Sequence, residues 1–370
     1  MRAGPVEERG GAVEQTSGGA THFDDGGATR RVRRPSAWGS WGLVLSIVAA
    51  YALCYDLATR TGGVPRVGKE DAPEGQVARE DYGSVVRGLA YAPDGSRLAV
   101  ATGEGLVVLR DLAAGREAVL RRGPTGSALV LAFAPDGSVL AAGGAGETVR
   151  LWDARTAREH PPLRVPGSRV SGLAFSPDGA RLTVSLWDGP LADWDWRAGR
   201  PAAAPPRPVP GLTGLVASPD GAALAACDAR GRVVVWNPPG AGGRAVPGHR
   251  TPATALALSP DGRSLASASS LDADARVLDP SSGAIRYALR DGGPGVTALA
   301  FSPDGSLLAT AHLDGKVRFY DAATGRVRGT LSAPRSFHAL AFSPDGATLA
   351  TGDQGGSVRF WSVAHGLATP

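Results

Sequence analysis

One tight turn, in which Pro-Asp-Gly follows a small residue, recurs seven times along the chain and constrains the fold more than any other feature. The prolines of the seven turns are Pro93, Pro135, Pro177, Pro219, Pro260, Pro303 and Pro344. They are separated by 42, 42, 42, 41, 43 and 41 residues. A period of this length is typical of repeat architectures in which each unit contributes one small supersecondary element.

The composition of the turn predicts strands on both sides of it. Proline presets φ for the second position of a type I turn, aspartate accepts hydrogen bonds from nearby amides, and glycine suits the last position. Short apolar runs flank each copy, which is typical of a β-hairpin. In the unit around Pro303 we expect strands at 296–302, 307–311 and 317–321. We interpret the seven turn aspartates as stabilising their own turns and not as a ring of ligands.

Fixed offsets around the turn predict how the sheets pack. A leucine lies four residues before and five residues after every one of the seven prolines. An aromatic residue lies two residues before the proline in five of the seven units. Both faces of each sheet are therefore expected to be buried, with bulky side chains of one sheet over small side chains of the next.

An aromatic residue followed by an acid lies seventeen residues after the turn proline. The pair is intact at Trp152-Asp153 and Trp194-Asp195. Altered forms of it are Arg110-Asp111, Trp236-Asn237, Tyr320-Asp321 and Trp361-Ser362, and Leu278-Asp279, which lies one place later in the longer fifth unit. With these pairs the chain resembles the WD-repeat propeller family over roughly residues 84–363. The resemblance implies an all-β fold, a seven-bladed β-propeller with four-stranded blades.

The two ends of the repeat region predict how such a ring would close. The last unit ends with its third strand, so that blade lacks a fourth strand of its own. We expect a segment near Gln76–Asp81 to supply it, because closure removes a bare sheet edge. In unit three the segment 201–210 is rich in proline, which cannot donate to a strand ladder. The fourth strand of that blade is expected to be interrupted.

The N-terminal region predicts a membrane segment before the repeats. Residues 1–36 are expected to be a disordered tail that ends in an Arg cluster, and 37–57 a transmembrane or signal-anchor helix. A linker at 58–75, the propeller at 76–364 and a C-terminal tail at 365–370 complete the organisation. A cleaved signal peptide and a buried apolar segment are the alternatives for 37–57.

The distribution of positive charge predicts the orientation of the chain. Four arginines lie immediately before the apolar segment, and the basic residues after it are more spread out. The positive-inside rule then places the N-terminus in the cytoplasm and the propeller on the extracytoplasmic side. The alternatives are a secreted or periplasmic protein after cleavage, and a cytoplasmic one.

Motifs that would indicate catalysis do not occur in the sequence. There is no nucleophile elbow, phosphate loop, zinc-protease motif or Cys-x-x-Cys pair. The formal net charge is only +4, without an Arg/Lys stripe, so nucleic acid is not an expected partner. Cys54 and Cys227 are not expected to form a disulfide. We expect no enzyme activity, no cofactor and no metal, and the resemblance implies a structural role for His249.

The resemblance also implies where a partner would bind. In this family the turns between second and third strands share one face with the entrances to the first strands. The candidate partner-binding residues on that face are Arg87, Arg169, Trp187, Asp188, Leu313, Asp314, His338 and Gln354. An exposed tryptophan near arginines is a common composition of interaction hot spots.

Three functions are compatible with this sequence. The favoured one is a membrane-tethered, non-catalytic WD-repeat scaffold that binds an unidentified protein or peptide, with a monomeric propeller. The second is a ligand-binding or enzymatic periplasmic propeller, similar to the lactonase-like or Tol-type proteins, which also use Ser-Pro-Asp-Gly turns. The third is a soluble cytosolic scaffold.

Overall fold

A computed structural model shows the architecture of the repeat region. It describes residues 73–121, 128–166, 169–202, 209, 211–237, 242–272, 274–290 and 295–368. The predicted N-terminal tail, the predicted membrane helix and most of the predicted linker lie outside these residues. Among the helices of the described residues, none has both the length and the apolar character needed to span a bilayer.

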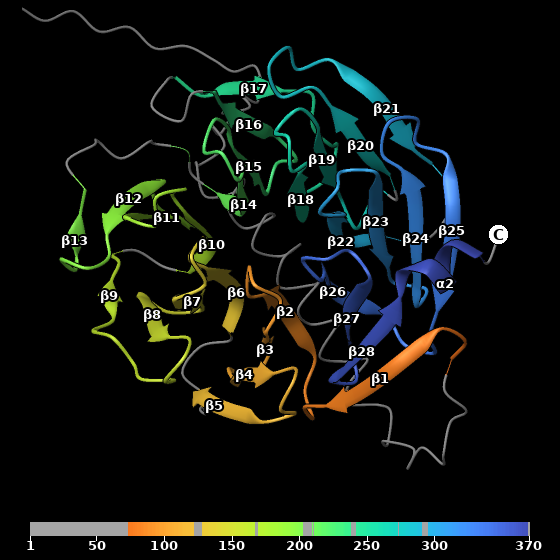
Figure 1. Ribbon diagram of the computed structural model, residues 1–370. Coiled ribbons are helices and arrows are strands. Elements are labelled where there is room, and N and C mark those ends of the chain that lie inside the picture. Colours follow the sequence, from red (N-terminus) through yellow and green to blue (C-terminus); the bar gives the residue numbers. More distant parts are fainter. Residues whose placement is uncertain are drawn as a thin grey trace, which may run out of the picture. The chain divides into compact units, whose positions relative to one another are not determined.

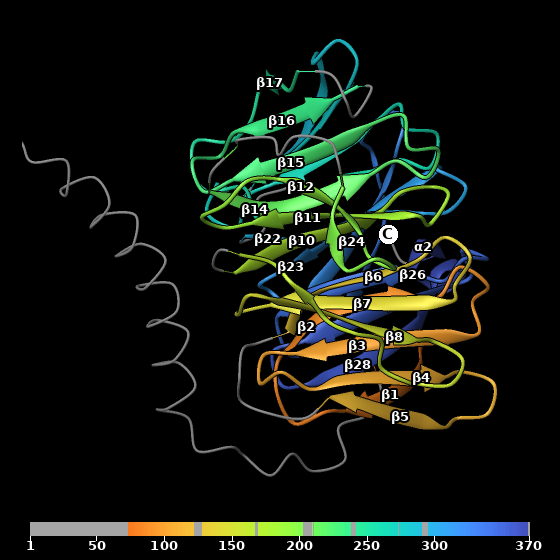
Figure 2. The same cartoon turned by 90° about the vertical axis from the view of Figure 1, so that its left-hand side faces the viewer.

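The described part of the chain forms seven four-stranded antiparallel sheets, each a blade of one β-propeller. Figure 1 shows the blades arranged around a common centre, with the first strand of each blade innermost. Figure 2 shows one blade from the side, with β14 to β17 following one another in order. The first strands of neighbouring blades pack against one another all the way around the ring, including β2 against β26. The predicted all-β, seven-bladed fold is confirmed.

The first four blades follow the repeat units in order. Blade 1 contains β2 (Val86–Tyr91), β3 (Arg97–Thr102), β4 (Val107–Asp111) and β5 (Glu117–Arg121). Blade 2 contains β6 (Ala128–Phe133), β7 (Val139–Gly144), β8 (Thr148–Asp153) and β9 (Leu163–Arg164). Blade 3 contains β10 (Val170–Phe175), β11 (Arg181–Leu186), β12 (Ala192–Asp195) and β13 (Arg200–Pro201). Blade 4 contains β14 (Leu212–Ala217), β15 (Leu224–Asp228), β16 (Val233–Trp236) and β17 (Arg244–Val246).

The last three blades differ only at the end of the chain. Blade 5 contains β18 (Ala255–Leu258), β19 (Leu265–Ala268), β20 (Ala275–Leu278) and β21 (Ile285–Leu289). Blade 6 contains β22 (Val296–Phe301), β23 (Leu307–His312), β24 (Lys316–Asp321) and β25 (Val327–Ser332). Blade 7 contains β26 (Phe337–Phe342), β27 (Thr348–Asp353), β28 (Ser357–Ser362) and β1 (Gln76–Asp81). The short helix α2 (Val363–Ala368) follows β28, where we expected only a tail.

Ring closure follows the prediction from the sequence. β1 pairs antiparallel with β28, and Arg79 lies opposite Arg359 in the register. The Ser357 hydroxyl donates to Asp81 Oδ1 at 2.5 Å, which joins the two ends of the described chain by a side-chain contact as well. The predicted closing strand is confirmed, and β28 gains the partner that its own end of the chain lacks.

The core lies between the blades. Among the described residues, seven apolar clusters form, and each joins two neighbouring blades. Between blades 1 and 2, the small Ala99 and Ala101 of one sheet meet Leu140 and Trp152 of the next. The cluster containing Val86 joins blade 1 to blade 7, so the clusters run round the whole ring. This is the predicted packing of bulky over small faces, and it explains why one blade alone could not bury its sheet.

The Pro-Asp-Gly turns lie together at one end of the ring, which we call the turn face. The turn glycines have positive φ, for example +69° at Gly221 and +71° at Gly305. Asp304 Oδ1 accepts the Ser306 amide at 3.1 Å and the Ser302 hydroxyl at 2.5 Å. Corresponding bonds to the other six turn aspartates lower the pKa of their carboxyl groups. The predicted role of these aspartates in their own turns is confirmed.

The two residues of an aromatic–acid pair have different roles, one in the core and one in a turn. Trp152 is buried between blades 1 and 2, while the adjacent Asp153 accepts the amides of Arg155 at 3.1 Å and Thr156 at 2.6 Å. The acid therefore begins the turn to the fourth strand. In blade 3 that strand has only the two residues of β13, consistent with the prolines that follow it.

Candidate functional site

The predicted partner-binding residues lie at the opposite end of the ring from the Pro-Asp-Gly turns, on what we call the entrance face. Because first and second strands are antiparallel, the start of one adjoins the end of the other. The Trp187 amide donates to the Arg169 carbonyl at 2.9 Å, and the Gln354 amide donates to the Ser336 carbonyl at 2.9 Å. The Leu313 amide donates to a carbonyl in the same way at 3.2 Å. Strand entrances and second turns thus form one surface, as predicted.

Hydrogen bonds between blades make this surface continuous. The Gly211 amide of blade 4 donates to the Trp187 carbonyl of blade 3 at 2.8 Å. The Ser336 hydroxyl of blade 7 donates to the Leu313 carbonyl of blade 6 at 2.8 Å. Thr297 Oγ1 of blade 6 donates to the Phe337 carbonyl of blade 7 at 2.7 Å. These bonds from one amide and two hydroxyl groups to backbone carbonyls link blade 3 to blade 4 and blade 6 to blade 7 along the rim.

Arg169 and Trp187 form the best-defined pair of the predicted site. Arg169 Cζ lies 5.9 Å from the centroid of the Trp187 ring, within cation–π range. Both side chains are half-buried, and the neighbouring Asp188 is exposed. Burial, with the nearby charge of Arg87, lowers the pKa of Arg169. The pair offers a flat apolar surface with a cation against it.

Arg87 and His338 lie on the innermost strands of the neighbouring blades 1 and 7. Each is the second residue of its strand, in β2 and β26. Burial and the charge of Arg87 lower the pKa of His338 to about 4, so the imidazole is neutral at pH 7. Arg87 thus acts electrostatically on residues of two different blades, and the structure brings these predicted residues to one region of the face.

The remaining predicted residues lie on blades 6 and 7. Asp314 Oδ2 pairs with Arg318 Nη2 at 2.8 Å, and its Oδ1 accepts the Lys316 amide at 3.0 Å. The Asp314 carboxylate therefore stabilises its own turn. Leu313 and Gln354 are partly buried beside the strand entrances that follow them.

One residue of this face was missed by the sequence reasoning. Leu271 lies on the second turn of blade 5 and is 50% exposed. A leucine among the serines and aspartate of a polar turn was the available signal. The irregular spacing of unit five hid its equivalence to Trp187 and Leu313 in the other units.

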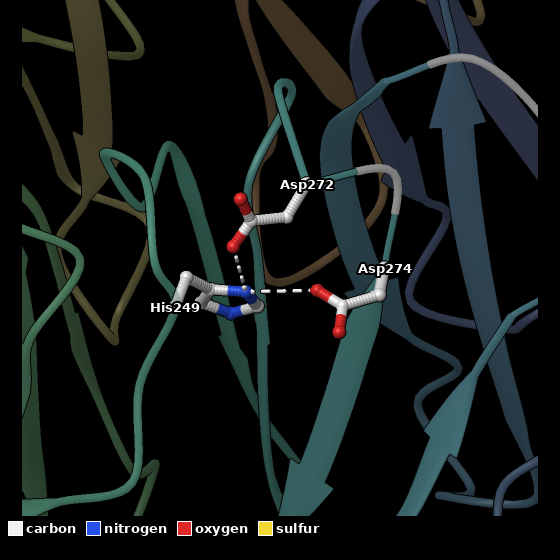
Figure 3. A group of neighbouring side chains, drawn as sticks. All are labelled: His249, Asp272 and Asp274. Carbon is white, nitrogen blue, oxygen red and sulfur yellow. Dashed lines mark hydrogen bonds and ion pairs between the residues drawn. The ribbon is translucent and has the colours of Figure 1, made fainter.

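Figure 3 shows a cluster of ligand-type side chains in blade 5, formed by His249, Asp272 and Asp274. His249 Nδ1 lies 3.1 Å from Asp274 Oδ1 and 3.7 Å from Asp272 Oδ2. His249 Nε2 lies 3.0 Å from the Ser267 hydroxyl. Burial lowers the pKa of His249, so the neutral ring donates from Nδ1 to Asp274 and accepts from Ser267.

The carboxylates of this cluster have further partners. Asp272 accepts the Arg250 amide at 2.8 Å and the Thr251 hydroxyl at 2.5 Å. Asp274 Oδ2 accepts from Arg276 at 3.2 Å, so a cation bound there would face a guanidinium group. The network joins the entrance of blade 5 to its second turn, which is the structural role that the resemblance implied for His249. The expectation of no metal stays a prediction.

A comparison with protein-family models identifies the repeats. The family described as "WD domain, G-beta repeat" matches residues 118–153, 243–279, 288–321 and 325–362. Each match begins in or beside the outermost strand of one blade and ends within one residue of the end of the third strand of the next. The repeat in the sequence is thus offset from the structural blade by one strand, as ring closure through β1 requires.

A search of curated proteins gives no significant match. The family assignment therefore depends on the matched repeats together with the seven blades. Four repeats match the family model, and the remaining three blades have the same strand order and the same Pro-Asp-Gly turn. The four matched repeats and the seven-bladed fold are consistent with the WD-repeat β-propeller family.

Proposed function

We propose that this protein is a membrane-tethered, non-catalytic scaffold that binds another protein on its entrance face. Propellers of the WD-repeat family generally bind protein partners and are typically not enzymes. The observation that carries the proposal here is the half-buried Trp187 against Arg169 on a continuous rim. Tryptophan and arginine are the residue types most often responsible for binding energy at protein interfaces.

The rigidity of the rim supports docking without rearrangement. Backbone bonds on either side of Trp187 link it to Arg169 in its own blade and to Gly211 in the next. A surface held in its bound geometry loses little conformational entropy on association. The proposed mechanism is therefore the display of side chains from several blades at set positions.

The composition of two cavities supports the absence of catalysis. They measure about 210 and 380 Å³ and lie at blade 2 and beside the outer strands of blades 4 and 5. Their lining in the described part of the chain contains arginine, small residues and a tryptophan, without histidine, cysteine or carboxylate. Such a lining places no histidine or carboxylate beside the hydroxyls of Thr148 and Ser281 to act as a general base. A stoichiometric metal in the purified protein would instead favour the enzymatic periplasmic propeller.

Membrane attachment is proposed from the apolar segment 37–57 and the arginines that precede it. Removal of 37–57 is expected to shift the protein from the membrane to the soluble fraction. Protease added outside intact cells is expected to digest the propeller of the full-length chain, because we propose that this propeller lies on the extracytoplasmic side. The propeller of the chain without 37–57 should stay intact. Recovery of the unmodified chain in the soluble cytosolic fraction would contradict the tether.

A crosslinking experiment tests the docking face. A photo-crosslinking residue is placed at Gln354 or, as a matched control, at Ala347, in the full-length chain. These positions flank the two ends of β27, so they lie in one blade but on opposite faces. A partner on the entrance face is expected to crosslink from Gln354 and not from Ala347.

The captured protein is then purified and its affinity measured directly. We expect Trp187→Ala combined with Arg169→Glu to weaken binding by about 2 kcal/mol or more, as for a hot-spot pair. Equal crosslinking from both positions, or equal affinity of the variant and the wild type, would exclude the entrance face as the docking site.

A further inference from the structure

Two arginines and a neutral histidine lie at the entrance face although they are far apart in the sequence. Arg87 and His338 are the second residues of β2 and β26, and Arg169 directly precedes β10. These three strands are the innermost strands of blades 1, 7 and 3 (Figure 1), and all begin at the same end of the ring. We call Arg87, Arg169 and His338 the mouth cluster.

Electrostatic coupling supports the convergence of these side chains. The charge of Arg87 lowers the pKa of both Arg169 and His338, after the larger effect of burial. Blade 2 separates blades 1 and 3 around the ring, so this effect of Arg87 on Arg169 extends past one blade. Two guanidinium charges therefore lie at the entrance face beside the neutral imidazole of His338. A partly desolvated cation interacts more strongly with an anion than one on an open surface does.

The turn face carries a ring of carboxylates, with arginines such as Arg181 and Arg263 beside them. The turn face holds seven exposed aspartates, whose hydrogen bonds in their own turns lower the pKa of their carboxyl groups. They are Asp94, Asp136, Asp178, Asp220, Asp261, Asp304 and Asp345. An acidic segment would meet these carboxylates at the turn face, whereas at the mouth cluster it would meet the guanidinium groups of Arg87 and Arg169.

We propose that the mouth cluster binds an acidic peptide segment of the partner protein, with Trp187 contacting the apolar side chains next to the acids. This inference depends on the proposed function and specifies the chemistry of the partner. Guanidinium groups bind carboxylates through paired hydrogen bonds, and the Trp187 ring beside Arg169 adds a flat apolar contact. A polynucleotide is the less suitable ligand, because it needs a track of cations along its phosphates and the mouth cluster is compact.

The test measures binding of a fluorescein-labelled oligoglutamate peptide to the purified full-length protein by fluorescence anisotropy. An oligoglutamine peptide of equal length and an oligothymidylate are measured beside it. Arg87→Gln with Arg169→Gln removes charge from the mouth cluster. Arg155→Gln with Arg158→Gln removes the same charge from exposed positions in the turn between β8 and β9, at the other end of the ring.

We expect the mouth variant to weaken oligoglutamate binding about tenfold or more, as loss of charge-assisted bonds does. The control variant should change it by less than about twofold, since exposed charges contribute little. Melting curves of both variants show whether the fold is retained. Equal weakening by both variants, equal binding of oligoglutamine, or tighter binding of oligothymidylate would overturn the inference.

The crosslinking experiment at Gln354 separates the two proposals. If a partner is captured there but oligoglutamate binds no more tightly than oligoglutamine, the acidic-segment inference is contradicted. The proposal that the entrance face is the docking face would still stand. If no partner is crosslinked from Gln354 but oligoglutamate still binds at the mouth cluster, the scaffold proposal is contradicted. The mouth cluster would then be an anion-binding site only.

Discussion

At the scale of single residues, blade 7 contains an ion pair that is buried on both sides. Arg359 and Asp353 are 1% and 0% exposed and form a direct ion pair. Asp353 Oδ1 also accepts the amides of Gly355 at 2.8 Å and Ser357 at 2.9 Å. The carboxylate thus holds the second turn of the closing blade, and the guanidinium compensates its charge.

Arg359→Met is expected to destabilise the protein by roughly 3–5 kcal/mol, because it leaves a buried carboxylate without its counter-charge. Arg328→Met serves as the control, since Arg328 is 54% exposed and 3.6 Å from Asp321. Loss of that surface pair should cost about 0–1 kcal/mol. Urea unfolding measures both, and similar costs for the two variants would argue against the buried pair as a stabilising element.

His338 predicts a pH dependence of stability. Its pKa in the folded protein is about 4, lowered by burial and by Arg87, while the unfolded chain has an ordinary value near 6.5. As the pH falls from about 6.5 to 4, the unfolded chain gains a proton that the folded protein does not. Stability therefore falls over this range and is fully present above it.

We expect His338→Asn to lose less stability than the wild type between pH 7 and pH 4, by roughly 1–3 kcal/mol. Thermal unfolding at a series of pH values gives the difference. His249, whose pKa is also lowered, contributes equally to both proteins and cancels. Parallel curves for variant and wild type would show that His338 titrates normally in the folded state.

At the scale of the elements, the Pro-Asp-Gly turn acts in two blades at once. A Cβ added at Gly221 of blade 4 would lie 2.5 Å from Pro177 Cγ of blade 3. The corresponding prolines and glycines adjoin in other blades, with Pro344 of blade 7 next to Gly95 of blade 1. The turn thus shapes its own hairpin and also contributes to the contact between blades.

Gly221→Ala and Gly115→Ala separate these two contributions. Both glycines have positive φ, +69° and +65°, so each substitution costs about 1–2 kcal/mol of backbone strain. An added Cβ at Gly115 meets no atom within 4 Å, whereas at Gly221 it meets Pro177. Gly221→Ala should therefore cost about 1–3 kcal/mol more in chemical denaturation. Equal costs would mean that the turn does not contribute to blade packing.

At the scale of the whole molecule, stability depends on closing the ring. β1 is largely exposed, with Val77 63% exposed, so its contribution comes mainly from hydrogen bonds to β28. Without β1, β28 would present an unpaired edge at the junction between the first and last blades. The ring would then be joined there without this strand pairing, by contacts such as the apolar cluster between blades 1 and 7.

A chain that begins at Tyr82 is expected to melt more than about 5 °C below one that begins at Pro73, because about 1 kcal/mol shifts Tm by 2–4 °C at this size. Both chains lack the same N-terminal region, so the comparison isolates β1. Calorimetry measures the melting, and light scattering measures edge-to-edge association. Identical melting of the two chains would mean that closure by β1 contributes nothing to stability.

The sequence predicted part of the candidate site, but not its internal geometry. The strand register alone indicated that Arg169 and Trp187 would share a face, because they flank an antiparallel hairpin. The electrostatic effect of Arg87 on Arg169 could not be predicted, since it depends on the tilt of the blades and on side-chain conformations. The additional partners of Asp314 and Asp274 depend on side-chain conformations that no spacing in the sequence determines.

By itself, the sequence determined the hairpins, the number of blades and the closing strand. These follow from local turn chemistry and from a repeat of fixed length, which act within or between neighbouring units. Only the tertiary structure decided which charges meet at the entrance face, which carboxylates are already paired, and that the chain ends in α2. Those outcomes depend on contacts between residues far apart in the chain, where small changes in packing alter which side chains come within hydrogen-bonding distance.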